Sequence, residues 1–222
     1  MIQIANVSDI KSHMSDLQAV IFGLDNILYP LDDYVQSGFH QISRLFLGHG
    51  QEVYEQLWNA YRERGVTKAG MGKADIDTVN GEYTDIDDAV VGAIHAMLRQ
   101  NGLDSDELAE KCLRIYEQHR PNIQPYDGVV DLLKELREKG LRLGLLVDGQ
   151  PEMQREKIRA LGIVPLFDEI ILADDIAGHG DVMKFRTPNP ICFKIMSLRL
   201  DVPLEKMGAV GATLRSDIKL AL

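Results

Sequence analysis

The stretch LQAVIFGLDNILYP, residues Leu17 to Pro30, constrains the fold more than any other part of the chain. Its first half contains the four-residue apolar run AVIF, which is typical of a strand covered on both faces. Its second half carries Asp25 and Asn26, which favour tight turns, and Pro30 ends the segment. We therefore predict a buried strand that runs directly into an acidic turn.

The C-terminal half repeats this strand signal in alternation with helical patterns. Apolar runs predict strands at 141–147, 167–173 and 207–210. Apolar side chains over 129–136 predict a helix that ends at Gly140, and Pro151 predicts the first turn of a helix that runs to 161–162. A further helix is predicted after Pro190, over 191–200, and a last one begins over 216–222. Strands that alternate with helices form a parallel sheet covered on both faces. The fold class that we predict is α/β, with a Rossmann-like three-layer core.

The segment between these two parts, residues 31–120, has helical spacing throughout and no strand signal. It predicts four helices, the last capped by Asp104 or Ser105, and a long exposed loop over 65–84 that is rich in Gly, Thr and Asp. The sequence therefore predicts an α/β core from 1–30 and 121–222, with a helical cap subdomain inserted over 31–120.

The two ends of the chain are less patterned. Residues 1–16 are polar and unpatterned, and we expect a tail or a loosely docked lead-in. No strand follows the helix predicted at 216–222, so we expect the last strand of the core to be absent. The chain would then be truncated, part of a longer polypeptide, or an altered form of an active enzyme.

Charge and composition exclude several classes of partner. The net charge is −10 without a basic run, which argues against nucleic acid and against anionic lipid. There is no apolar run long enough to span a membrane and no signal-peptide pattern. Cys112 and Cys192 lie in apolar helical contexts and are expected to be buried thiols. We expect a cytoplasmic protein.

In parallel α/β sheets, ligands bind beyond the carboxyl ends of the strands. The segments that follow the predicted strands are FGLDNILYP, GLLVDGQP, FRTPNP and AVGATLRSDI. In this order they resemble the four motifs of haloacid dehalogenase (HAD) superfamily hydrolases, specifically the phosphatase and nucleotidase branch with a helical cap. The resemblance covers residues 17–222.

The resemblance implies phosphoryl transfer through an aspartyl-phosphate. In that family one Asp attacks phosphorus, and a second Asp, two residues later, is the general acid and base. A hydroxyl after the second strand and a Lys in the third motif hold the phosphate, and acidic residues in the fourth motif complete a magnesium site. A carboxylate nucleophile divides one difficult step into two, and the cations offset charge on the transferred group.

Transferred position by position, the resemblance retains two acidic residues. Asp25 takes the acid/base position, and Asp217 takes an acidic metal-binding position. The other positions do not match the family pattern. They are Gly23 for the nucleophile, Ile27 for a Thr, Val147 for the phosphate-binding hydroxyl, Thr187 for the Lys and Ala212 for a metal ligand.

Two functions are compatible with this pattern. The first is a HAD-like protein that has lost phosphohydrolase activity and acts by binding a protein or a small molecule, without a cofactor. The alternative is a phosphatase with a rearranged site that uses Asp25, with Lys184 as a substitute cation, Asp148 as a further candidate, and magnesium as its cofactor. The sequence does not identify the ligand.

Overall fold

The computed structural model describes residues 2–3, 16–69, 88–178, 180–187 and 189–211. These residues divide into two compact units. One unit contains residues 1–31 and 124–222, and the other contains residues 32–123. None of the helices in the described ranges is long and apolar enough to cross a membrane.

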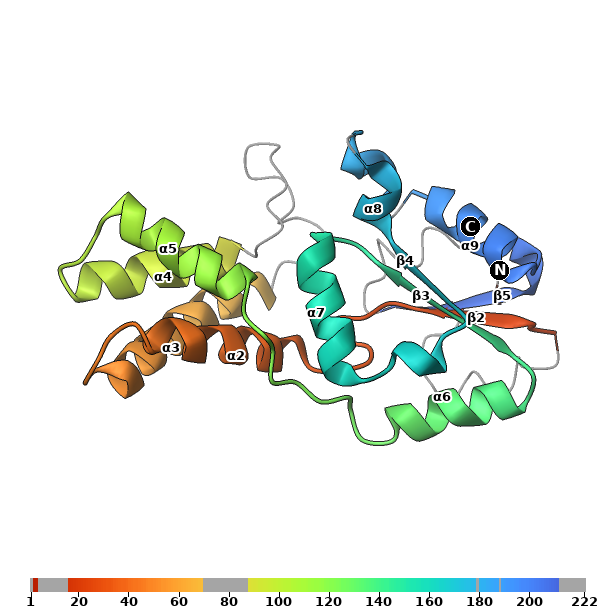
Figure 1. The fold of residues 1–222 in the computed structure, drawn as a ribbon, viewed down its shortest axis with the longest axis horizontal. Helices are drawn as coiled ribbons and strands as arrows, with labels where there is room; N and C mark the ends of the chain where they lie inside the picture. Colours follow the sequence, from red (N-terminus) through yellow and green to blue (C-terminus); the bar gives the residue numbers. More distant parts are fainter. Residues whose placement is uncertain (1, 4–15, 70–87, 179, 188, 212–222) are drawn as a thin grey trace. The chain divides into compact units, whose positions relative to one another are not determined.

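The first unit is built on a parallel sheet of five strands (Figure 1). Across the sheet the order is β1 (Ile2–Gln3), β5 (Met207–Val210), β2 (Ala19–Phe22), β3 (Arg142–Val147) and β4 (Glu169–Leu172). This confirms the predicted α/β class and places β2 at the centre.

The register aligns the carboxyl ends of the central strands. Phe22, the last residue of β2, is paired with Leu145 on one side and with Val210 on the other. Strand β1 was not predicted, because two residues give no periodic signal. Its pairing with β5 agrees with a docked lead-in, and not with a free tail, for Ile2 and Gln3. The predicted helix over 216–222 lies outside the described residues.

Helices cover both faces of the sheet. They are α6 (Val129–Glu138), α7 (Pro151–Leu161), α8 (Ala173–Ala177) and α9 (Ile191–Leu200), with single 3₁₀ turns at Val164–Leu166, Val182–Lys184 and Leu204–Lys206. In Figure 1, α9 lies on one side of the sheet and α6 on the other. Apart from the short α8, these helices were predicted, α6 from its apolar side chains and Gly140, and α7 and α9 from the prolines that open them.

The core under α9 shows why the strand sequences are apolar at every position. Ala19 and Ile21 of β2 pack in one cluster with Cys192 and Met196 of α9. Val20 and Phe22 are equally buried, but strand side chains alternate between faces, so they point to the opposite side. A strand covered on both faces therefore needs a continuous apolar run, as the sequence indicates.

The second unit is a group of four helices. They are α2 (Leu31–Ser43), α3 (Gly50–Ala69), α4 (Asp88–Gln100) and α5 (Asp106–Glu117). Ser105 caps α5, since its side chain accepts a hydrogen bond from the Leu108 amide at 3.1 Å. The loop predicted over 65–84 was wrong for residues 65–69, which continue α3, and its remainder lies outside the described residues.

Candidate functional site

The site begins at Gly23, the first residue beyond β2. The Gly23 amide donates a hydrogen bond to the carbonyl of Val210 at 3.1 Å, which continues the pairing of β2 with β5. A Cβ atom placed on Gly23 would lie 2.6 Å from Cδ1 of Ile27. The Ile27 side chain therefore occupies the space that a side chain at position 23 would enter.

A tight turn over residues 24–29 presents Asp25. The amide of Leu28 donates to the Leu24 carbonyl at 3.0 Å, and the amide of Asn26 donates to the Tyr29 carbonyl at 3.1 Å. Asn26 adopts a positive φ of 59°, a conformation that Asn tolerates better than most residues. Its side-chain oxygen also accepts a hydrogen bond from the Leu31 amide at 3.0 Å. These contacts fix the backbone on both sides of Asp25.

Two side chains hold the Asp25 carboxylate. The Tyr29 hydroxyl donates to Oδ1 at 2.5 Å, and Lys157 Nζ lies 3.1 Å from both oxygens. Lys157 is buried in α7, with a side chain only 5% exposed, whereas Asp25 is 31% exposed. The carboxylate thus has a fixed position and an adjacent positive charge, and it retains access to solvent.

Sequence reasoning missed Lys157. The available signal was its place on the apolar face of α7, where Lys157 lies three residues after Gln154, next to Ile158 and four residues before Leu161. A Lys within such a face must be paired when it is buried, because an isolated buried charge is costly. The partner could not be found without the fold.

The second motif places Val147 at the end of β3, where it is 5% exposed. The next residue, Asp148, accepts two hydrogen bonds from Thr187 at its Oδ2 atom. The Thr187 amide lies at 3.0 Å and the Thr187 hydroxyl at 2.5 Å. The structure therefore brings two of the predicted motifs together, through a contact that the sequence did not predict.

The other oxygen of Asp148, Oδ1, is buried and has no hydrogen-bond partner among the described residues. Burial raises the pKa of Asp148 to about 6, although the hydrogen bonds from Thr187 and the charge of Arg186 oppose that shift. Oε1 of the buried Gln154 is likewise without a partner in the described part of the chain. This part of the site is rich in hydrogen-bond acceptors, which is unfavourable for a phosphate dianion.

The positively charged residues near the third motif segment, Arg186 and Lys184, both form ion pairs. Arg186 donates through Nε to Asp174 Oδ1 at 2.8 Å, and both side chains of this pair are nearly buried. Lys184, the predicted substitute for the missing Lys, lies 3.8 Å from Asp181 and is 75% exposed. The structure thus places Lys184 in a surface ion pair. Ala212 and Asp217 lie outside the described residues.

The donor set of the described residues does not fit a magnesium ion. Magnesium prefers carboxylate oxygens in an octahedral arrangement, but Gly23 supplies no side chain. Asp25 is paired with Lys157, and no group of three His, Cys, Asp or Glu side chains that could hold a metal occurs in the described ranges. We therefore derive no step through a metal.

Chemically, the site can offer one solvent-accessible carboxylate, Asp25, in a fixed position. It cannot form a covalent intermediate at residue 23, which has no side chain, and Val147, where the resemblance predicts a phosphate-binding hydroxyl, carries an apolar side chain. The two cysteines do not contribute a nucleophile. Both are buried and free, and burial raises the pKa of Cys112 and of Cys192 to about 11.

Comparison with known proteins identifies relatives along almost the whole chain. The sequence model of the family described as haloacid dehalogenase-like hydrolase matches residues 17–222. The glyceraldehyde 3-phosphate phosphatase of Methanopyrus kandleri is 27% identical over 210 residues, which cover 91% of this chain and 78% of the relative. The N-acylneuraminate-9-phosphatase of Mus musculus is 28% identical over 211 residues, which cover 93% and 78%.

A solved structure has the same fold. The HAD-hydrolase YfnB of Bacillus subtilis, in a crystal form bound to magnesium, superposes with a TM-score of 0.59 at 19% sequence identity. The match covers 91% of this chain and 81% of YfnB.

Proposed function

The chain belongs to the haloacid dehalogenase-like hydrolase family, and on that premise we propose that it is a phosphatase that hydrolyses phosphate monoesters without a covalent phosphoenzyme, with Asp25 as its acid–base residue. Several of its curated relatives are named as phosphatases, and these names support this reaction class over a loss of activity. The observation that carries the proposal is the Asp25 carboxylate, held by Tyr29 and Lys157 beyond the end of β2.

The absence of a side chain at Gly23 determines the route. Without a carboxylate at that position, water must attack phosphorus directly. The oxygen of water forms the new P–O bond while the ester P–O bond breaks, Asp25 accepts the proton of the attacking water, and the leaving alkoxide takes a proton from solvent. Lys157 and Tyr29 act as positioning residues for Asp25.

Such a site is expected to be slow. Loss of the nucleophile alone commonly costs several powers of ten in kcat. The two cations near Thr187 in the sequence, Lys184 and Arg186, are both held in ion pairs. The expected activity is therefore measurable but far below that of family members that keep the nucleophile.

The test compares the full chain with Asp25→Asn. Phosphate release is followed with p-nitrophenyl phosphate, glyceraldehyde 3-phosphate and N-acylneuraminate 9-phosphate, in magnesium and in chelator. The proposal expects slow turnover that Asp25→Asn abolishes and that a control at an exposed carboxylate, Glu205→Gln, leaves unchanged. Intact-protein mass spectrometry after acid quenching should detect no phosphoryl adduct. An adduct would contradict the direct route.

A second function is favoured by one observation, the Ile27 side chain in the space next to Gly23. An apolar side chain there suits a scaffold that binds a protein or a small molecule without turnover. In that case the full chain and Asp25→Asn are equally inert. Restoring the motifs with Gly23→Asp, Ile27→Thr, Val147→Thr, Thr187→Lys and Ala212→Asp would then create an activity that the starting chain lacks.

A further inference from the structure

A cavity of about 540 Å³ lies in the first unit at the outer edge of β4. It is bounded by α7 on one side and by α8 and α9 on the other. Its volume is within the range of pockets that take small organic molecules, about 300–1,000 Å³. None of its lining residues belongs to the four motif segments that follow the strands of the candidate site.

The lining shows that the cavity opens onto the edge of the sheet. Three consecutive residues of β4, Ile170, Ile171 and Leu172, all contribute to it. Successive strand side chains point to opposite faces, so a single cavity can touch all three only by wrapping around the strand edge. In the described part of the chain β4 pairs only with β3, so this edge has no neighbouring strand. Ile158 and Ile176 extend the apolar surface on the two sides.

The charged residues of the lining are mainly cationic. Arg155, Arg159 and Arg199 line the cavity together with a single acid, Asp175, so the lining carries three positive charges and one negative charge. The acids that pair with these arginines, Glu152, Glu156 and Glu169, lie outside the lining, so the guanidinium groups are the hydrogen-bond donors that the cavity presents to an anionic ligand.

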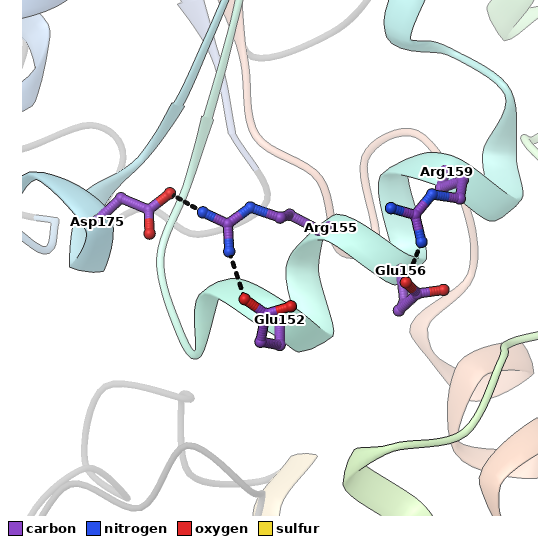
Figure 2. A network of polar contacts seen from close by, with 5 residues as sticks. All are labelled: Glu152, Arg155, Glu156, Arg159 and Asp175. Carbon is purple, nitrogen blue, oxygen red and sulfur yellow. Dashed lines mark hydrogen bonds and ion pairs between the residues drawn. The ribbon is translucent and has the colours of Figure 1, made fainter.

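The arginines are held in ion pairs that a ligand can replace. Figure 2 shows Arg155 between Glu152 and Asp175, at 2.7 and 2.5 Å, and Arg159 paired with Glu156. Arg199 lies 2.6 Å from Glu169. The three Arg side chains are 42 to 70% exposed, and ion pairs at such exposed sites contribute little to stability. An anion can therefore recruit a guanidinium at small cost.

We propose that this cavity binds a small organic anion, with an apolar body against the edge of β4 and a carboxylate, sulfonate or phosphate group on the arginines. The planar guanidinium groups suit oxyanions of this kind. The site is independent of the proposed phosphatase reaction, since it shares no residue with Asp25 and its partners.

The test uses anilinonaphthalene sulfonate, which combines an apolar body with one anionic group, and its neutral counterpart N-phenylnaphthylamine. We expect the full chain to bind the sulfonate with saturable fluorescence enhancement and the neutral compound much more weakly. Arg155→Gln with Arg199→Gln should raise the dissociation constant about tenfold or more, as expected for loss of charge-assisted hydrogen bonds. Added salt should weaken binding to the unmodified chain.

Matched variants test whether the sulfonate binds in this cavity. Arg114→Gln, at an exposed and paired Arg of the helical unit, and Asp25→Asn should leave the dissociation constant unchanged. Val164→Asn places an amide on the apolar lining at a half-exposed position and should weaken binding without unfolding the chain. Equal affinity for the neutral compound, or no change in the double Arg variant, would overturn the proposal. The proposal would also be overturned if the unmodified chain did not bind the sulfonate and the double Arg variant self-associated. The arginines would then only protect the edge of β4 from pairing with another chain.

Discussion

Lys157 Nζ lies 3.1 Å from each carboxylate oxygen of Asp25, although 132 positions separate the two residues in the sequence. The fold creates this pair by placing helix α7, which follows β3, beside the turn that follows the neighbouring strand β2. Because Lys157 is buried and Asp25 is partly exposed, the pair is asymmetric. Removing one partner therefore has different consequences from removing the other.

Lys157→Met should destabilise the chain by about 1–3 kcal/mol, because it leaves Asp25 without its cationic partner while the Tyr29 hydrogen bond remains. Asp25→Asn leaves a buried ammonium facing an amide and should also destabilise. The double variant should be more stable than the sum of the single effects predicts. Denaturant unfolding measures all three, with the exposed Arg159→Gln as a control expected to change stability by less than ~0.5 kcal/mol. Additive effects would show that the two charges are not coupled.

Gly23 and Ile27 should be coupled through space rather than through charge. Gly23→Ala places a Cβ 2.6 Å from Cδ1 of Ile27 and should cost about 1–3 kcal/mol, as overpacking commonly does. Ile27→Val removes only that Cδ1 atom. In a chain that already carries Ile27→Val, Gly23→Ala should lower the free energy of unfolding by at least ~1 kcal/mol less than it does in the starting chain.

The measurement is a double-mutant cycle by urea unfolding. If Gly23→Ala costs the same in both backgrounds, Ile27 does not fill the space beside residue 23. The comparison is independent of catalysis, so it remains informative for a chain without turnover.

Most of the fold could be predicted from the sequence, because its signals are local. The apolar run 19–22 and the helix signals of Pro151 and Gly162 depend on a few neighbouring residues, and the structure places β2 and α7 there. The two-residue strand at Ile2–Gln3 could not be predicted, because it has no periodicity and exists only through its pairing with β5. The continuation of α3 to Ala69 was hidden by Gly65, whose low helix propensity the structure overrides.

The contacts of the site could be predicted far less well. The turn at Asp25 follows from residue types, but its partner Lys157 belongs to a helix far along the chain. The same holds for Asp148 and Thr187, which are 39 positions apart. Such contacts depend on which strands are neighbours, and the one-dimensional pattern does not contain that information. The roles inferred for Gly23, Val147, Thr187, Lys184, Ala212 and Asp217 remain predictions.

The cap of α5 gives a local prediction that concerns only the helical unit. Ser105 has extended backbone angles, φ −145° and ψ 135°, and its side chain satisfies the Leu108 amide. Ser105→Ala should lower stability by about 1 kcal/mol, whereas Ser105→Asp should keep the hydrogen bond and most of the stability. Thermal unfolding followed by circular dichroism distinguishes the two, and equal losses in both variants would exclude a capping role.

Asp148 should make stability depend on pH in an unusual direction. Burial raises its pKa from 3.8 in the unfolded chain to about 6 in the folded chain. Between about pH 4 and pH 6 the folded state therefore binds more protons than the unfolded state, so this group lowers the free energy of unfolding as the pH rises. Above about pH 6 Asp148 is ionised in the folded chain as well, so the free energy of unfolding is lowered by the full cost of burying the charge and falls no further. A carboxylate stabilised by an ion pair would show the opposite slope.

Asp148→Asn should remove this penalty. The amide oxygen can still accept the hydrogen bonds of Thr187, and its NH₂ group can supply a donor where buried acceptors lack partners. We expect the variant to gain about 1–3 kcal/mol at pH 8 and almost nothing at pH 4, from a shift of about two units at ~1.4 kcal/mol per unit. Urea unfolding across this pH range measures the difference, with Glu205→Gln as an exposed control. A variant less stable than the starting chain at pH 8 would show that the ionised carboxylate is favourable where it lies, and that its bonds with Thr187 outweigh its burial.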